Sequence, residues 1–412
     1  MEPSQAMSGV RVVELTTFGF VPSGVALLAD WGADVIKLEH PRVPDPMRGL
    51  VTAQAPDGSV VDTLMDHFNR GKRNLAVDLG SDEGRSVLDV LIREADVFIT
   101  SFLKPAQRKL RVTADDLRSV NPRLIYAHGH GYGPRGADAD QPGFDSISYW
   151  ARGGVGHALT FEGGPPAQQR AAFGDVMGGL SVATGVAAAL YRRSVTGEGC
   201  TVDVSLLSVA CWQLAPDILR SSITGSFTQS PAPTSGRAPY RTADGRFVTI
   251  PLLLPHYLPN LLQGLDRADL LEQPSVAAFR GGVDAPAEID TLLREAIGAL
   301  TAAELRVRLR GREIAWSVMQ SPDEVLEDPQ VVANEYVVPL PSQDGRYVVA
   351  GPVQFDQRPP GIASGAPRQG EHTGAILREL GFEEDAIQRL LEQGVVRQGA
   401  EGGWDDHGRL RS

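Results

Sequence analysis

The N-terminal half of the chain alternates strand and helix patterns, and this alternation limits the fold more than any other feature. Val10–Leu15 is a short run rich in β-branched residues, Ser23–Trp31 has the apolar spacing of a helix, and Asp34–Glu39 is a second strand pattern. Pro22 precedes the helical segment and suits a first helical turn. Strand, helix and strand within about 30 residues form a βαβ unit, which implies parallel strands and a right-handed crossover.

The same alternation returns further along the chain. Strand patterns at Leu75–Leu79, Asp96–Thr100 and Arg123–Ala127 are separated by two helical segments. The first of these runs from an N-cap at Ser81 to Ala95, and the second covers Thr113–Val120. Several strands separated by helices predict an open, Rossmann-like α/β sheet with parallel strands.

The rest of the chain combines long helices with hairpins. Gly174–Arg193 and Asp203–Leu219 are predicted as long helices, and Ser230–Pro239 has the composition of a linker. Hairpins are predicted at Tyr240–Pro251 and Ser342–Val349, because each contains an Asp-Gly turn signal. The tail is predicted to fray from about Gln398. Further helices are predicted at His256–Leu265, Glu288–Leu300, Ala302–Arg310, His372–Leu380 and Glu384–Glu392.

Composition excludes several classes of protein. Of 412 residues, 42% are hydrophobic and 22% charged, which is typical of globular chains rather than disordered ones. A net charge of −12 opposes non-specific nucleic-acid binding. Cys200 and Cys211 are too few for a disulfide framework or a four-cysteine metal site. Without an apolar run near the roughly 18 residues of a membrane span, or a signal-peptide pattern, we expect a cytoplasmic protein with no membrane partner.

Motifs for common cofactors and nucleophiles are missing. The first strand–helix turn has only Gly19 and Gly24 where a dinucleotide site needs G-x-G-x-x-G, and the chain contains no P-loop or G-x-S-x-G elbow. A plain Rossmann dehydrogenase and a serine hydrolase are therefore disfavoured. His128 and His130 share one face of an extended segment, but no third ligand recurs at zinc-site spacing. We interpret them as polar residues at a strand end, and we expect no metal.

Two short windows carry the basic charge. Asn69–Arg73 holds three cations and Lys104–Arg111 holds four, and neither contains an acid. Such groups suit a polyphosphate, because guanidinium and ammonium groups donate charge-assisted hydrogen bonds to phosphate oxygens. A solvated surface face is the alternative, and charge alone favours it.

Asp175 is the acid with the most unusual surroundings. It lies between Gly174 and the pair Gly178 and Gly179, directly before a long apolar helix. Aspartate is a preferred helix N-cap, and position alone favours this structural role. The flanking glycines also leave few side chains to block a large electrophile, and carboxylates serve as covalent nucleophiles in such settings. The residues themselves leave both interpretations open.

The chain resembles the class III CoA-transferases (CaiB/BaiF), a family that includes formyl-CoA transferase, carnitine CoA-transferase and α-methylacyl-CoA racemase. The resemblance implies a large discontinuous α/β domain, a small α+β domain and an interlocked homodimer. It places the large domain at 1–225 and 336–412 and the small domain at 226–335. The matching blocks are Leu27–Pro41, Asn69–Leu79, Glu94–Phe102, Asn121–Gly133, Pro142–Asp145, Phe173–Gly179, Thr196–Leu207 and Gly370–Thr373.

The resemblance also implies an activity and a site. Asp175 would be the nucleophile that accepts an acyl group from an acyl-CoA, and CoA would pass to a carboxylic acid through this covalent intermediate. The glycines beside Asp175 would supply N–H donors to the oxyanions. Coenzyme A would be the co-substrate. Its predicted contacts are Gly19, Phe20, His40, Val77, Ser101, Phe102, Lys109, Phe144 and Asp145.

Departures from the family pattern narrow this expectation. Gly19 stands where formyl-CoA transferase has a glutamine, which disfavours formate or oxalate as substrates. Phe144 stands where the racemase branch has a histidine, and phenylalanine cannot exchange a proton. An acyl-CoA racemase or isomerase that uses Asp175 as acid and base remains the alternative, followed by a CoA-binding protein in which Asp175 is only a cap. The donor and acceptor acids do not follow from these residues.

Overall fold

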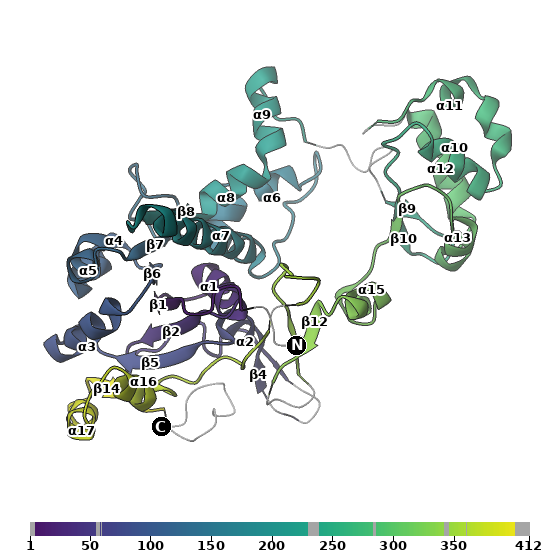
Figure 1. The fold of residues 1–412 in the computed structure, drawn as a ribbon. Coiled ribbons are helices and arrows are strands. Elements are labelled where there is room, and N and C mark those ends of the chain that lie inside the picture. The colour runs from purple at the N-terminus through teal and green to yellow at the C-terminus, as the bar shows by residue number, and fades with distance from the viewer. Residues whose placement is uncertain are drawn as a thin grey trace. The chain divides into compact units, whose positions relative to one another are not determined.

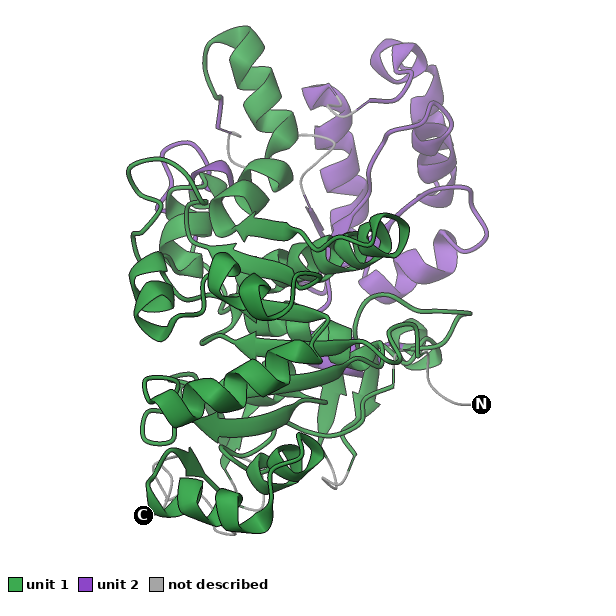
Figure 2. Cartoon of the chain, turned by 60° about the vertical axis from the view of Figure 1, so that its left-hand side comes forward, with its two compact units in different colours: residues 1–156, 168–227, 329–412 green, residues 157–167, 228–328 purple. Residues whose placement is uncertain are grey.

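The computed structural model describes residues 5–54, 58, 60–229, 239–282, 286–341, 346–359 and 361–399. The chain divides into two compact units, which are coloured separately in Figure 2. Unit 1 comprises 1–156, 168–227 and 329–412, and unit 2 comprises 157–167 and 228–328. The predicted large-domain range 1–225 thus includes a short segment, 157–167, that groups with unit 2.

Unit 1 is built on a seven-stranded sheet in the order β14-β5-β2-β1-β6-β7-β8 (Figure 1). All neighbours pair in parallel except β14, which adds antiparallel to β5 at one edge. The strands are β1 (Arg11–Leu15), β2 (Asp34–Glu39), β5 (Arg73–Val77), β6 (Val97–Thr100), β7 (Ile125–His130), β8 (Thr201–Ser205) and β14 (Val396–Arg397). Two separate hairpins pair β3 (Thr52–Gln54) with β4 (Val60–Asp62) and β12 (Val337–Pro339) with β13 (Tyr347–Val349).

Helices cover both faces of this sheet. Alternate strand residues, such as Val12 and Val13, enter two different apolar clusters, so each face is buried against its own helices. One face packs against α1 (Phe20–Asp30) and α7 (Phe173–Thr196). The opposite face packs against α3 (Asp82–Arg93), α5 (Ala114–Val120), α16 (Thr373–Glu379) and α17 (Glu384–Glu392). The remaining helices of this part of the chain are α2 (Thr63–Asn69), α4 (Lys104–Leu110), η1 (Asp145–Ala151), α6 (Val155–Ala158), α8 (Leu206–Gln213), α9 (Ala215–Thr224) and α15 (Pro329–Ala333).

Unit 2 combines a small sheet with helices around its own apolar core. Strand β10 (Phe247–Thr249) pairs antiparallel with β9 (Tyr240–Arg241) and β11 (Ser317–Val318), and Gly245 adopts a positive φ in the predicted Asp-Gly turn. The helices are α10 (Tyr257–Gly264), η2 (Ala268–Glu272), α11 (Pro274–Ala278), α12 (Ala287–Gly298), α13 (Ala302–Arg308) and α14 (Pro322–Leu326). Within this unit, Leu258, Leu261 and Leu293 are buried in one cluster with Val248.

Most predicted elements are confirmed, and one long helix is wrong. The segment predicted as a helix at Asp203–Leu219 begins instead as strand β8, which ends at Ser205. The Ser205 side chain then accepts a hydrogen bond from the Ser208 N–H in a capping box, so the helix starts only at Leu206. The linker at 230–238 and the second Asp-Gly turn at 342–345 lie outside the described residues, as does the tail from residue 400.

Helix α7 spans Phe173–Thr196 and is thus slightly longer than the predicted Gly174–Arg193. Among the described residues, this helix alone has the length and hydropathy that could cross a membrane. Such a helix is weak evidence for a span, because core helices have the same properties. Here Val182, Ala183 and Val186 of α7 pack into the apolar cluster beneath α1, as the core helix of a globular fold does.

Candidate active site

The strand order places a crevice between β1 and β6. Chain connections diverge there, since β2 and β5 lie on one side of β1 while β7 and β8 lie beyond β6. In open α/β sheets, ligands bind outside the carboxyl ends of the strands at this reversal of order. Two cavities open here. One is lined by Asp175 and the other by Leu15 and Phe102, and Thr17 lines both.

Asp175 lies in the first turn of α7, and its interpretation as an N-cap is wrong. The N-cap position is Ala172, which has a positive φ of 60° and no capping side chain. The carboxylate that takes the capping role belongs to Asp145, whose Oδ1 accepts a hydrogen bond of 3.1 Å from the Gly174 N–H. A Cβ on Gly174 would lie only 2.5 Å from that oxygen, so glycine permits the contact. The Asp175 carboxylate is therefore free of capping.

The glycines after Asp175 serve packing rather than open access. A Cβ on Gly178 would collide with the ring of Phe20, and one on Gly179 would collide with Ser23. These two glycines let α1 and α7 cross closely, which fixes the start of α1 beside Asp175. The expected oxyanion role of the flanking glycines therefore needs correction, because the Gly174 N–H already binds Asp145 and the other two lie under α1.

The start of α1 provides other donors next to the carboxylate. A Cβ on Gly19 would lie 2.6 Å from Oδ2 of Asp175, so the loop before α1 touches this side chain. No side chain caps α1, and its first turn contains no acid. The N–H groups of Phe20 and Val21 have no partner within the described part of the chain. Such unpaired amides at a helix N-terminus favour negative charge.

Burial raises the pKa of the Asp175 carboxyl to about 7, and the nearby Asp145 carboxylate adds to the shift. The pKa of Asp145 is also raised by burial, although its backbone hydrogen bonds from Gly174 and Asp175 oppose this. A buried carboxylate with a raised pKa is a stronger nucleophile than an ordinary one, because little solvation must be removed before it attacks.

This pKa predicts the pH dependence of any reaction in which Asp175 attacks as the carboxylate. The group is protonated below its pKa of about 7, so kcat/KM falls about tenfold per pH unit below that point and is level above about pH 8. Measuring kcat/KM between roughly pH 5.5 and 9 checks this. A profile that is flat through neutrality, with its inflection near the ordinary aspartate value, would contradict the expectation.

The Asp175 cavity, about 180 Å³, combines aromatic walls with a few polar groups. Phe144 is 46% exposed and packs edge-on against Phe18, with ring centres 5.1 Å apart. Predicted residues Phe20, Ser101 and Phe144 line this cavity together with Asp175. The other lining residues are Thr17, Phe18, Leu103, Lys104, His128, Gly129, His130, Gly131, Ala139, Pro142, Gly143 and Leu206.

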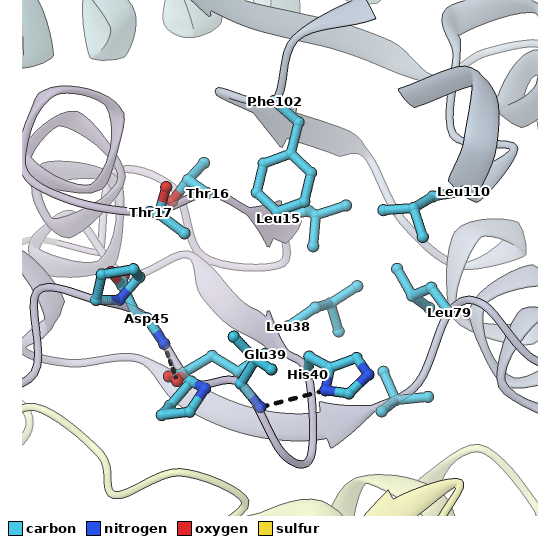
Figure 3. Close-up of a pocket in the computed structure, with 14 residues that line it drawn as sticks. Leu15, Thr16, Thr17, Leu38, Glu39, His40, Asp45, Leu79, Phe102 and Leu110 are labelled. Carbon is cyan, nitrogen blue, oxygen red and sulfur yellow. Dashed lines mark hydrogen bonds between the residues drawn. The ribbon is translucent and has the colours of Figure 1, made fainter. Parts of the chain in front are cut away.

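The second cavity, about 310 Å³, is mainly apolar and holds three further predicted residues, His40, Val77 and Phe102. Phe102 and His40 lie on opposite sides of it (Figure 3). The His40 ring is held because its Nδ1 accepts hydrogen bonds from the N–H groups of Arg42 and Val43. An apolar slot of this size, bordered by polar groups, suits a planar base.

A buried ionic cluster holds the loop that separates the two cavities. Lys37 Nζ lies 2.9 Å from Asp45 Oδ2 and donates to the Thr16 carbonyl, while Asp45 Oδ1 accepts from the Phe18 N–H. Lys37 and its second partner Glu14 are fully buried. The neighbouring acids raise the pKa of Lys37 against the opposing effect of burial, so the amine stays charged. The cluster thus positions Thr16–Gly19 against Asp175.

The cations of the two basic windows differ in their partners. In the first, Arg70 binds the buried Asp30, Lys72 binds the buried Glu14 and Arg73 binds Asp34, so these cations are structural. They are neither a solvated face nor free for a phosphate, which corrects both interpretations of that window. In the second, Lys109 and Arg108 are exposed on α4 and have no ion pair among the described residues. Lys109 lines neither cavity.

Sequence reasoning missed two side chains at the site, Asp203 and Arg42, and named a third, Lys104, only as part of the basic window Lys104–Arg111. Asp203 approaches His130 from the neighbouring strand β8, and its segment had been predicted as helix. Lys104 lines the Asp175 cavity, and Arg42 is an exposed cation close to His40. The strand pattern Thr201–Ser205, which alternates threonine or aspartate with valine, is the signal that would have placed Asp203 beside β7.

Comparisons with known proteins agree with this geometry. The model of "CoA-transferase family III" matches residues 7–373, so the chain belongs to this family. The chain is 30% identical over 401 residues to (R)-2-hydroxy-4-methylpentanoate CoA-transferase of Clostridioides difficile, covering 95% of this chain and 99% of that protein. It is also 30% identical to formyl-CoA:oxalate CoA-transferase of Streptomyces coelicolor, covering 95% and 100%.

A solved structure has the same fold. The crystal structure of a CAIB/BAIF family protein from Brucella suis is similar with a TM-score of 0.78 and 25% identity, covering 92% of this chain and 100% of that one. With the family membership and the named relatives, this similarity identifies the chain as a CoA-transferase enzyme that uses CoA thioesters.

Proposed function

We propose that the protein transfers CoA from an acyl-CoA to a carboxylic acid through a covalent intermediate on Asp175. The observation that carries the proposal is the position of the Asp175 carboxylate, which is partly buried and in contact with Gly19 at the topological switch point of the sheet, where burial raises its pKa to about 7. Family membership supplies the reaction class, and this carboxylate supplies the nucleophile.

The steps balance without a further reactant. The Asp175 carboxylate attacks the thioester carbonyl, the C–S bond breaks, and a mixed anhydride forms as CoA thiolate leaves. The thiolate then attacks the aspartyl carbonyl, releasing the donor acid as a carboxylate and leaving an aspartyl–CoA thioester. An acceptor carboxylate attacks this thioester, and the thiolate finally takes the acyl group from the new anhydride, which restores Asp175.

We assign stabilisation of the oxyanions in these steps to the amides at the start of α1, which have no partner among the described residues. Phe20 and Val21 carry N–H groups next to Gly19, which itself lies against the Asp175 carboxylate. Removal of one oxyanion donor typically costs about 3 kcal/mol of transition-state stabilisation.

CoA would extend from the apolar cavity to the Asp175 cavity past Thr17. We assign the adenine to the slot between His40 and Phe102, beside Val77, and the phosphates to the exposed cations Arg42, Arg108 and Lys109. Ser101 supports this path, because its Oγ accepts a hydrogen bond from the Thr17 N–H at the wall that both cavities share. Asp145 would act indirectly, by capping α7.

Trapping of the intermediate tests the proposal. The protein is incubated with a panel of acyl-CoAs, quenched with hydroxylamine or borohydride, and analysed by intact and peptide mass. We expect modification of the peptide that contains Asp175, and none in Asp175→Asn. Exchange of the α-proton for deuterium without any adduct would support the alternative, an acyl-CoA racemase or isomerase, and would overturn CoA transfer.

We also propose that the protein is a homodimer, with a second copy covering the outer face of α7, α8 and α9. Trp212 and Ile223 are each 85% exposed, and Tyr191 is 74% exposed, so these helices present large apolar side chains to solvent. Helix α9 has no buried residue at all. Large apolar side chains exposed on helices that pack on one another are typical of surfaces that a partner covers.

Light scattering during gel filtration tests the dimer. The wild type is expected at twice the chain mass of 44.1 kDa, and Trp212→Glu combined with Ile223→Glu is expected to shift it toward one chain or to aggregation. Val307→Glu, a matched change on the exposed face of α13 in unit 2, should leave the mass unchanged. A monomeric wild type would refute the proposal.

A further inference from the structure

His128 and His130 are buried on β7 and line the Asp175 cavity, yet nothing in the transfer steps uses them. Their rings are 3.8 Å apart. Together with Asp203 they bring nitrogen and oxygen atoms within 4.8 Å of one another. Atoms of this cluster that have no hydrogen-bond partner remain available to a ligand in the cavity.

The hydrogen bonds of the cluster determine which ring nitrogens carry protons. His128 Nε2 lies 2.9 Å from the Phe102 carbonyl, and His130 Nε2 lies 2.7 Å from Asp203 Oδ1. A carboxylate only accepts, so Nε2 of His130 donates to Asp203, whereas Nε2 of His128 lies beside both the Phe102 carbonyl and, at 3.0 Å, the Gln107 amide. In the neutral ring, the proton on Nε2 leaves Nδ1 with its lone pair.

The two Nδ1 atoms differ in their surroundings. Nδ1 of His128 has the side-chain amide of Gln107 at 3.5 Å, which also reaches its Nε2. Nδ1 of His130 has no partner among the described residues, although the residue is only 5% exposed. His130 lines the cavity, and its ring is held by Asp203 as a catalytic histidine is held by its aspartate, so we take its Nδ1 as the acceptor available to a ligand there.

We propose that His130, oriented by Asp203, accepts a hydrogen bond from a hydroxyl group on the acyl chain of the substrate. The site then prefers hydroxy acids over the corresponding acids that lack the hydroxyl. The rest of the substrate is apolar, because Phe18, Phe144 and Leu206 line the same cavity. This inference rests on the proposed function, since the acyl group must lie within reach of Asp175.

The charges around His130 argue against a second carboxylate at this position. Asp145, Asp175 and Asp203 are all near the cavity, and an acceptor nitrogen offers no proton to an anion. Among the residues that the structure describes, Lys104 is the one lysine or arginine that lines this cavity, and its Nζ donates to the Pro134 carbonyl. A hydroxyl donor therefore complements the site better than a carboxylate does.

The test compares substrates within each variant. With one donor acyl-CoA held constant at pH 8, kcat/KM is measured for butanoate, 2-hydroxybutanoate, 3-hydroxybutanoate and succinate. We expect the wild type to favour one hydroxy acid over butanoate about tenfold, because an unmatched buried acceptor is costly. His130→Leu should reduce this ratio to about one, and an unchanged circular-dichroism spectrum shows an intact fold. His130→Gln, which keeps an acceptor oxygen, should recover part of the preference.

Several outcomes would overturn the inference. One is an unchanged hydroxyl preference in His130→Leu, and another is a wild type that favours succinate and loses this preference in Lys104→Gln. Submicromolar binding of Zn²⁺ by the wild type, lost in His130→Leu, would show that the nitrogen is a metal ligand instead. Exchange of the α-proton for deuterium by the wild type, lost in His130→Leu, would show that His130 acts as a base instead. If no acid accepts CoA and Asp175 forms no adduct, the proposed function itself fails. If transfer occurs but the ratio of hydroxy acid to butanoate is the same in the wild type and in His130→Leu, only this inference fails.

Discussion

Asp175→Asn is expected to lower kcat for CoA transfer at least about 10⁴-fold, because the amide cannot attack the thioester carbonyl and no intermediate forms. Binding of acyl-CoA should change little, since the amide has the same size as the carboxylate. Steady-state kinetics with a turnover-supporting acyl-CoA and acid, together with binding measured by calorimetry, check both parts of this expectation.

The same substitution should stabilise the fold at pH 8. The pKa of Asp175 is raised from its ordinary value of 3.8 to about 7, so the folded state holds its proton more tightly than the unfolded state does. The stability penalty is absent below about pH 4, grows as pH rises, and is complete above about pH 7. A pKa shift of about three units sets an upper limit of about 4 kcal/mol on this stability penalty. Because the side chain is partly exposed, we expect a penalty of about 2 kcal/mol.

Asp115→Asn is the matched control, because it makes the same chemical change at an exposed position of α5. It should leave both kcat and the free energy of unfolding nearly unchanged. Retention of transfer activity within tenfold of the wild type by Asp175→Asn would show that Asp175 is not the nucleophile. Loss of activity together with a lower free energy of unfolding at pH 8 would point to a structural role.

Lys37→Met is expected to lower the free energy of unfolding by about 4 kcal/mol. The change removes the amine from between two fully buried acids, and an uncompensated buried charge typically costs 3–5 kcal/mol. Activity should fall as well, because Asp45 then loses the partner that holds it against the Phe18 N–H. Urea unfolding of the variant and the wild type measures the first effect.

Two further variants sharpen this experiment. Lys109→Met removes an amine from the exposed surface of α4 and should change stability by less than about 0.5 kcal/mol. Combining Lys37→Met with Asp45→Asn removes the stranded charge and should recover part of the lost stability. Equal destabilisation by Lys37→Met and Lys109→Met would exclude a structural role for the buried cluster.

The sheet of unit 1 was largely predictable from the sequence because its signals are local. Asp34–Glu39 has the same bounds in the structure as in the prediction, and Ser81 caps α3 by accepting from the Gly84 N–H. The start of strand β8 was not predicted, because Asp203 and Ser205 interrupt its valines and leave a weak strand pattern. Pairing with β7 in the folded sheet overrides this weak local preference.

The site was predictable only in part, because its key contacts join distant segments. The resemblance selected Asp175, Gly19 and Asp145, but the contact of Gly19 with the Asp175 carboxylate and the capping of α7 by Asp145 were not predicted, because they join segments far apart in the chain. Similarly, the sequence shows the cations of Asn69–Arg73 but not their ion-pair partners, because Asp30 and Glu14 lie in other elements. Their partners decide that this window is structural.

The antiparallel strand β14 has a consequence for how the protein is made. Its residues Val396 and Arg397 pair with Val77 and Ala76 at the edge of the main sheet, so a segment late in the chain completes a layer that begins with β1. During synthesis, the segment 228–328 emerges whole and can fold as a unit before β14 exists, whereas the sheet edge at Val77 stays unpaired until residues 396 and 397 have emerged. A chain truncated before residue 396 would leave β5 as an open edge, exposed to pairing with other chains.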